Sequence, residues 1–444
     1  MDFQILFPVV AFALALVGTL RSLGWGLSAV VAVGYLNGVV RANYLGVYST
    51  FMFDAGVLGL YAGFLAFHRP PAGLLRTAAG VFVVLLVAWP LLVATVPVND
   101  YLVQLVALRG TVWFLPVLLI ATRLTAADLT TLARGAGVLN LGAIAVGLYE
   151  FQNGIEAVFP RNAVTDIMYR SGDVAGNTAF RIPSTFLSAH SYGGAMLFTL
   201  PLCLDRLFGR ASHPLDRLLA GCGVVAAVAG ILLSAARSPL VVLAVAAALS
   251  VAVARLNLWF VLGVGVIGCV GVGLASTSER LQRAATLDDT QLVATRVGGS
   301  VNETFLDVLL SYPFGAGMGS SVGTSVPFFL ADRAPPQIGL ENEFSRITVD
   351  QGWVGLGLWV ALLVWLFARV PHARFAAPWQ TGKVLMYSLL LASWGTAFIG
   401  TGALSAIPQS VLLLAQMGVV AGDRRRAALE PPPAGRKPSP PPAR

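Results

Sequence analysis

Residues 218–275 read LLAGCGVVAAVAGILLSAARSPLVVLAVAAALSVAVARLNLWFVLGVGVIGCVGVGLA. The segment contains three apolar runs, 218–235, 238–254 and 258–275, which are joined only by the short turns SAARSP and ARLN. Runs of about 20 apolar residues cross the hydrocarbon core of a bilayer as helices. Because connections this short cannot form a separate domain, the segment predicts helices that cross a membrane back and forth.

The rest of the chain repeats this pattern. Of its 444 residues, 57% are apolar and 11% are charged, whereas soluble domains carry roughly 25% charged residues. We therefore predict an all-α polytopic membrane protein with 12 or 13 transmembrane helices, the count depending on the first two runs. The chain begins MDFQ, which lacks the basic stretch of a cleaved signal peptide, so the first run is expected to be retained. The other expected helices lie near 5–20, 24–40, 51–67, 78–97, 102–121, 136–150, 187–204, 347–368, 383–401 and 404–421.

The Arg and Lys residues of the short loops define an orientation. Alternate loops on one side contain eleven Arg and one Lys, whereas the short loops on the other side contain only Arg41 and Arg237. Basic loops stay cytoplasmic, so the long loops 151–183 and 276–346 are expected on the periplasmic side. The basic residues of the cytoplasmic loops are Arg21, Arg69, Arg76, Arg123, Arg134, Arg206, Arg210, Arg217, Arg255, Arg369, Arg374 and Lys383.

This topology divides the chain into six segments. They are N-terminal transmembrane helices (1–150), a first periplasmic loop (151–183), central transmembrane helices (184–275), a large periplasmic loop (276–346), C-terminal transmembrane helices (347–421) and a disordered, Pro- and Arg-rich cytoplasmic tail (422–444).

Charge and cysteine content exclude several classes of function. The net charge of +8 comes from the basic loops and the tail. It predicts contact with anionic lipid headgroups and not with nucleic acid. The three cysteines lie in apolar runs, so they predict neither a disulfide framework nor a metal site. The chain has no internal repeat, which disfavours an inverted-repeat transporter.

The large loop is polar, and long ordered loops commonly carry function. Apolar residues recur at near-helical spacing around 281–292 and 301–309, which predicts two amphipathic helices on the outer surface. The sequence YPFGAGMGS then ends the second helix, because Pro313 and three alternate glycines disfavour regular structure.

Four further motifs follow one another in a fixed order. They are RIPSTFLSAHSYGGAMLFTLPL (181–202), SAARSPLVVLAVAAALSV (234–251), Arg296 followed by PFGAGMG (313–319), and ENEFSRITVDQGWVGLGLWV (341–360). In their order, spacing and topology they resemble the O-antigen ligase and Wzy-type polymerase superfamily of bacterial membrane glycosyltransferases. The resemblance covers roughly residues 180–370; the N-terminal third resembles the family only in hydropathy.

This resemblance implies a GT-C-like helical fold in the bacterial inner membrane. It implies transfer or polymerisation of a glycan from an undecaprenyl-pyrophosphate carrier at the periplasmic face, without a cofactor, metal or nucleotide sugar. The acceptor would be another glycan or a lipid, and a chain-length regulator protein is a candidate partner. The implied products are O-antigen (lipopolysaccharide), capsule or exopolysaccharide.

The resemblance also implies catalytic residues. The Arg of the family's Ser-Arg turn falls on Arg237, and the Arg before its Pro-x-Gly-x-Gly element falls on Arg296. The His of its His-Asn pair falls on Glu341, followed by Asn342. The base would then be a carboxylate, and this departure favours a polymerase or another transferase over a ligase.

Physical chemistry supports these roles independently. A pyrophosphate leaving group needs fixed cations, and guanidinium groups bind phosphate bidentately. An acceptor hydroxyl needs a base within hydrogen-bond reach. Structural explanations stay open as well: Arg237 fits a side chain that extends to lipid headgroups, Arg296 a surface ion pair, and Glu341 a helix cap near Asn342.

Further polar residues are candidates for substrate binding. Arg181 and His190 flank the start of an expected helix, where His190 also fits a satisfied interfacial residue. Arg109 and Asp54 lie inside expected helices, and charges at membrane depth are either paired or functional. We expect Arg109 to face a cavity at the level of the outer loops, where it pairs with Asp54 or contacts the carrier phosphate.

Two other functions are compatible with the sequence. A transporter or flippase of lipid or polysaccharide would carry charged or broken helices near the middle of the membrane in both halves of the chain. A non-catalytic subunit of an envelope synthesis complex would use the loops to bind a partner. Polar residues here gather on one side, in two long loops, which favours chemistry at the membrane surface.

Overall fold

The computed structural model describes residues 3–68, 73–170, 180–209, 213–254, 305–321, 326–336, 338, 340, 342–370, 379–398, 400 and 402–429. Within these ranges the protein is helical and contains no strand. Six of the described helices are long and apolar enough to cross a membrane, and four shorter ones are apolar as well. The chain is therefore a multi-pass, all-helical membrane protein, as the sequence predicted.

Every expected run that the structure describes contains a helix, and the run at 258–275 lies outside the described residues. Their bounds are α1 Leu6–Arg21, α2 Leu23–Asn43, α3 Val47–Thr50, α4 Met52–Phe67, α5 Ala78–Val93, α6 Tyr101–Val112, α7 Pro116–Ala121, α8 Ala126–Asn153, α9 Asp166–Arg170, α10 Ala189–Phe208, α11 Pro214–Leu233, α12 Arg237–Ala254, α16 Leu306–Ser311, α17 Glu343–Phe367, α18 Gln380–Thr396 and α19 Gln409–Leu429. Three short 3₁₀ helices are η1 Phe3–Ile5, η2 Ile155–Ala157 and η6 Phe328–Arg333.

Local chemistry explains where two of these helices differ from the expected ranges. α8 begins at Ala126, ten residues before 136, because Thr125 and Asp128 form a capping box that satisfies the first free N–H groups. The expected helix 102–121 is divided into α6 and α7, and α7 begins at Pro116, which has no N–H to continue the preceding helix. At the C-terminus, α19 extends to Leu429, into the segment predicted to be a disordered tail.

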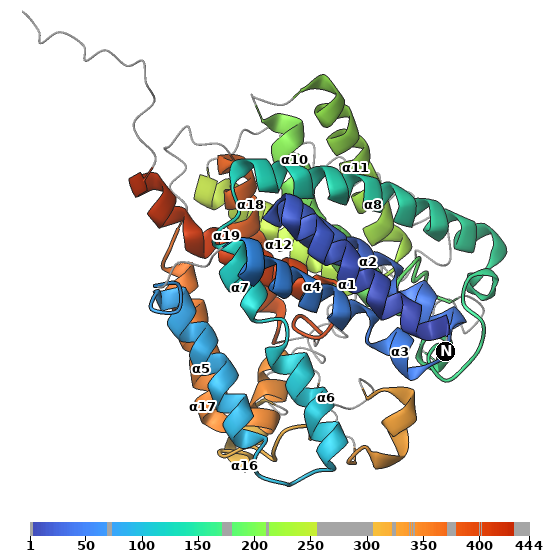
Figure 1. The fold of residues 1–444 in the computed structure, drawn as a ribbon, viewed down its shortest axis with the longest axis vertical. Helices are drawn as coiled ribbons and strands as arrows, with labels where there is room; N and C mark the ends of the chain where they lie inside the picture. The colour runs from blue at the N-terminus through green and yellow to red at the C-terminus, as the bar shows by residue number, and fades with distance from the viewer. Residues whose placement is uncertain are drawn as a thin grey trace, which may run out of the picture.

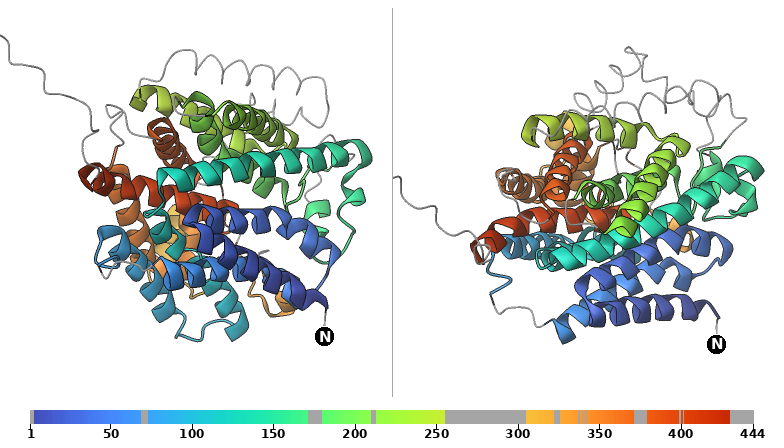
Figure 2. Two further views of the ribbon diagram at one scale, coloured as in Figure 1. Left: turned by 45° about the horizontal axis from the view of Figure 1, so that its top comes forward. Right: turned by 90° about the horizontal axis from the view of Figure 1, so that it is seen from above.

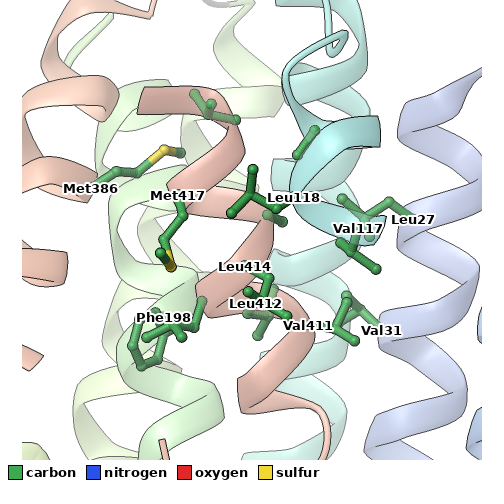
Figure 3. Packing of buried hydrophobic residues seen from close by; sticks show 14 of the residues in the cluster. Leu27, Val31, Val117, Leu118, Phe198, Met386, Val411, Leu412, Leu414 and Met417 are labelled. Atoms are coloured by element: carbon green, nitrogen blue, oxygen red, sulfur yellow. The ribbon is translucent and has the colours of Figure 1, made fainter. Parts of the chain in front are cut away.

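The core forms around α19. Leu118 of α7, Phe198 of α10, Met386 of α18 and Leu414 of α19 belong to one buried cluster, and Figure 3 shows these helices converging there. α8 packs between α2 and α11, and crosses the bundle as a long helix in Figure 2. This core fixes the relative positions of α2, α10 and α19, whose ends surround the site described below.

A second part of the structure contains α5, α6, α16 and α17. α5 lies beside α17 (Figure 1), and the loop after α16 packs against both α6 and α17. Gly315, Gly317 and Gly319 in this loop all have positive φ angles, of 80°, 91° and 92°. Such angles let the backbone turn sharply, and α16 ends at Ser311, directly before YPFGAGMGS, as predicted.

The glycine loop 313–319 interrupts α17. Gly352 has φ 67° and ψ −168°, values that do not occur in a helix. At this point the N–H of Trp353 donates to the carbonyl of Pro313 (2.9 Å), and the carbonyl of Val349 accepts from the N–H of Ala316 (2.6 Å). One helical hydrogen bond is thus replaced by two bonds to the loop, so α17 is a broken helix.

The first long loop is folded against α2. The Asn43 side chain donates to the carbonyl of Val158 (3.0 Å), and the Asn162 side chain donates to the carbonyl of Ala42 (2.8 Å). Phe159 and Met168 are buried against Ala42. These contacts hold residues 155–170 over the end of α2.

Candidate functional site

A cavity of about 910 Å³ opens at one end of the bundle, where α2 ends and α10 and α17 begin. Its walls come from the last turns of α2, the middle of α6, the first turns of α10 and α17, and the folded loops that contain α9 and η6. Residues 405–407, before α19, complete the lining. Four arginines line the cavity: Arg41, Arg109, Arg161 and Arg346.

Arg41 lies in the last turn of α2 and has no hydrogen-bond or ion-pair partner among the described residues. Its Nε atom is buried without a hydrogen bond, and so is the Oδ1 atom of Asn37, one turn earlier. Gly34 and Gly38 lie on the same face of α2 and also line the cavity. This face of α2 therefore presents a cation and an amide to the cavity, both with unused hydrogen-bonding capacity.

Arg109 projects into the cavity from α6 and forms a bidentate ion pair with Asp54 of α4. Its Nε donates to Oδ1 at 2.6 Å and its Nη2 donates to Oδ2 at 2.7 Å, and the guanidinium stacks on Phe51 at 5.5 Å. The predicted Arg109–Asp54 pair is confirmed. Arg41 interacts electrostatically with both residues, so these three charged groups together carry one excess positive charge.

Arg161 occupies the loop wall of the cavity and is paired. Its Nε and Nη2 atoms donate to Oε1 of Glu156 at 3.0 and 2.6 Å, and its guanidinium lies 4.7 Å from the ring centre of Tyr169. The Tyr169 hydroxyl donates to the carbonyl of Phe159. Burial, followed by the charge of Glu156, raises the pKa of Tyr169, so this phenol stays neutral and acts as a donor.

The first turns of α17 carry three charged residues at positions i, i+3 and i+7. Glu343 is fully buried; it pairs with Arg346 and accepts a hydrogen bond from the N–H of Gly402 at 2.8 Å. Asp350 accepts from the N–H of Ser321 at 2.9 Å and from the Ser321 hydroxyl. Arg346, Asp350 and Ser321 line the cavity. One guanidinium thus lies between two carboxylates on this helix.

A second polar cluster lies beside the cavity. His190 Nδ1 is 3.1 Å from the hydroxyl oxygen of Ser238, and its ring lies next to Gly402. Arg181 and Glu343 act on His190 electrostatically. Segments around residues 181, 190, 238, 343 and 402, which are distant in sequence, therefore meet at one place.

The structure brings several of the predicted site residues together. Arg237 is the first residue of α12 and immediately precedes Ser238, the partner of His190. Asn342 is buried and caps α17, accepting from the N–H of Ser345 at 2.5 Å. Among the described residues, Arg109 belongs to the cavity lining, and Arg237, Arg181, His190 and Asn342 do not. Arg296 and Glu341 lie outside the described residues.

The sequence reasoning did not select Arg41, Arg346 or Asp350 as site residues. Arg41 was used only as a marker of membrane orientation. A signal was present in each case. Residues 34, 37, 38 and 41 place two glycines, an amide and a guanidinium on one face of an apolar helix, and residues 343, 346 and 350 align three charges on another.

Within the described residues, no group of three or more His, Cys, Asp or Glu side chains is arranged to hold a metal ion. No protein-family model matches the chain, and no curated protein matches it at a significant level. The properties of the site therefore come from the geometry alone. Around the cavity, Arg41, Arg109 and Asp54 sum to one positive charge and the three charged residues at the start of α17 sum to one negative charge, so the cavity can hold a molecule with an anionic group and hydroxyl groups.

Proposed function

We propose that the protein is a membrane glycosyltransferase of the O-antigen ligase and polymerase type. It transfers or polymerises a glycan from an undecaprenyl-pyrophosphate carrier in the synthesis of O-antigen, capsule or exopolysaccharide. The identity of the carrier comes from the sequence resemblance. The geometry of the cavity supports binding of the anionic diphosphate part of this substrate.

The observation that carries the proposal is Arg41, an arginine with no hydrogen-bond or ion-pair partner among the described residues, beside Arg109 in the same cavity. A cation without a partner in a largely apolar helical bundle is costly, so membrane proteins keep one where it binds something. A diphosphate fits because it presents oxygen pairs to planar guanidinium groups. These groups would also stabilise the charge that builds on the diphosphate as the glycosidic bond breaks.

The position of the cavity agrees with transfer at the periplasmic face. The basic loops that mark the cytoplasmic side include Arg21, immediately before α2, and Arg41 lies at the opposite end of the same helix. In the inner membrane of a bacterium this orientation directs the cavity to the periplasm. A lipid-linked diphosphate anchored in the outer leaflet would then reach the cavity with its glycan on the water side.

Reconstitution tests this function. The purified chain is placed in liposomes with a polyprenyl-pyrophosphate oligosaccharide, and the products are separated by size. We expect either a ladder of longer glycans, which identifies a polymerase, or one added block on a second acceptor, which identifies a ligase. Persistence of the unchanged donor in the presence of both kinds of acceptor would reject the proposal.

A transporter or flippase is the second candidate, and the break in α17 at Gly352 favours it, because interrupted helices are frequent at transport sites. Here, however, the interruption is filled by the glycine loop 313–319, which supplies hydrogen bonds to the exposed backbone groups. Movement of a fluorescent lipid-linked sugar between leaflets, with no new glycosidic bond, would establish transport instead. Binding of a partner protein with neither activity would indicate a subunit of an envelope complex.

A further inference from the structure

Two walls of the cavity differ in charge. Arg41, Arg109 and Asp54, from α2, α6 and α4, sum to one positive charge. At the start of α17, which forms the second wall, Arg346 lies between Glu343 and Asp350, and these three groups sum to one negative charge. A glycan donor bound with its diphosphate at the positive wall would direct its sugar, and the approaching acceptor, toward a different part of the lining.

Of the two carboxylates on α17, only Asp350 belongs to the lining. Glu343 is sequestered: both of its oxygens are engaged, one by Arg346 and the other by the N–H of Gly402. Asp350 is 5% exposed and lies one turn beyond Arg346, and its partner Ser321 also lines the cavity. Among the described residues, Asp350 is therefore the carboxylate of α17 that a bound molecule can contact.

The carboxylate of Asp350 is held in a fixed orientation. Its Oδ1 accepts from the N–H of Ser321 and its Oδ2 accepts from the Ser321 hydroxyl, while the backbone of Gly319 supplies a further hydrogen bond. A carboxylate offers about four acceptor positions. The three hydrogen bonds leave one of these positions, and Asp350 lines the cavity.

We propose that Asp350 is the base of the transfer reaction, and that Ser321 positions it; this inference rests on the proposed function. The acceptor hydroxyl oxygen forms a bond to the anomeric carbon of the donor sugar, and its proton passes to Asp350. The bond between that carbon and the diphosphate oxygen breaks, and its electron pair leaves with the diphosphate, beside Arg41 and Arg109. The proton is thus taken up on α17, and the negative charge of the leaving diphosphate is taken up beside Arg41 and Arg109.

The test compares Asp350→Asn, Asp350→Glu and Ser321→Ala with the wild-type full-length chain in liposomes. Two quantities are measured: the rate of glycan transfer at saturating donor, and the affinity for inorganic pyrophosphate. We expect Asp350→Asn to reduce the rate by about 10²–10⁴-fold, the usual contribution of a general base, with pyrophosphate affinity within about twofold of wild type. Asp350→Glu should restore part of the rate, and Ser321→Ala should lower it by about tenfold without changing the donor concentration at half-maximal rate.

The outcomes separate the two proposals. Wild-type protein that binds pyrophosphate but transfers no glycan overturns both the function and the role of Asp350. Active wild type together with an Asp350→Asn variant that keeps its rate overturns the role of Asp350 alone. If Asp350→Asn fails to fold, the rates of Asp350→Glu and Ser321→Ala test the role of Asp350. Full rates in both variants would show that the carboxylate only holds the glycine loop against α17.

Discussion

Charged residues at the two ends of the bundle differ in how they are paired. At the end where α2 begins, Asp128 accepts from the N–H groups of Gly24 and Thr125 at 2.9 Å. Asp216 is bound by Arg134 at 2.8 Å and by Arg206 at 3.1 Å. At the end where α2 stops, Arg41 and Asn37 keep polar atoms without a hydrogen bond. Arg206, at the first end, also has a buried Nε without a hydrogen bond, so the ends differ in one respect: Arg41 has no hydrogen-bond or ion-pair partner at all among the described residues.

On the proposed function, the largest effect expected within this comparison comes from removing Arg41. Arg41→Ala should lower the rate of glycan transfer by about 10²–10³-fold, because it deletes a fixed donor to the leaving group. Stability should hardly change, since the described residues provide no partner that would be left unpaired. Arg41→Lys should recover only part of the rate, because an ammonium group lacks the bidentate fork. A loss of folded protein in Arg41→Ala would show that Arg41 is structural and would remove the contrast between the two ends.

The next largest expected effect is on stability, and it comes from Gly352 of α17, against which the glycine loop packs. Gly352→Ala would place a Cβ 2.6 Å from the backbone carbonyl carbon of Phe314 at φ 67°, which should cost about 1–3 kcal/mol. Gly357, on the same helix, has nothing within 4 Å of the corresponding position and is the matched control. Gly357→Ala should be neutral or stabilising by about 0.4–1 kcal/mol. Unfolding by SDS titration in mixed micelles measures both, and equal stabilities would contradict the described packing of the loop.

Neutralising Asp54 should make the end of the bundle that contains the cavity more positive. Asp54→Asn leaves Arg41 and Arg109 without their shared carboxylate, so the local charge rises by one. Two charges about 10 Å apart at an effective dielectric constant of about 20 interact by about 1.7 kcal/mol, so pyrophosphate should bind roughly tenfold more tightly. Isothermal titration at two ionic strengths measures this affinity. Weaker binding would mean that Asp54 orients Arg109 more than it competes with the anion.

The smallest effect is expected at the end where α2 begins. The Arg134 side chain is 55% exposed, so Arg134→Ala should cost only about 0.2–1 kcal/mol of stability. Glycan transfer should remain at the wild-type rate, because Arg134 lies away from the cavity. The same reconstituted assay used for Arg41→Ala provides the comparison. A similar loss of transfer in both variants would show that arginines affect the rate through general stability.

Sequence periodicity was sufficient for the all-helical, multi-pass character of the chain, because a bilayer accepts only helices of a certain length and apolarity. It also found the Arg109–Asp54 pair, since two charges at membrane depth have few alternatives. It did not find the division between α6 and α7 from Pro116, nor the early start of α8, because both depend on local backbone chemistry outside the hydrophobic pattern.

The site was less accessible to sequence reasoning. Arg41 at the end of an apolar run looks like any arginine that extends to lipid headgroups, and its lack of a partner is a property of the folded bundle. The sequence alone does not distinguish Asp350 from Glu343 as a site residue. Only the folded structure shows that Asp350 lies beside the break in α17 and is bonded by Ser321, just after the glycine loop. Arg237, His190 and Arg181 were selected through motifs, and the structure places their segments beside the cavity. Their roles remain predictions, as do those of Arg296 and Glu341.

Membrane insertion of the chain must accommodate the interruption of α17. In a continuous helix the N–H of Trp353 would bond the carbonyl of Val349, but each of these groups instead bonds residues 313–316. Unsatisfied backbone groups are expensive in hydrocarbon, so the break at Gly352 is stable only while residues 313–316 supply these bonds. Before the loop docks, the same groups can pair with each other in an unbroken helix. Docking of the loop and bending of α17 are therefore coupled steps of assembly.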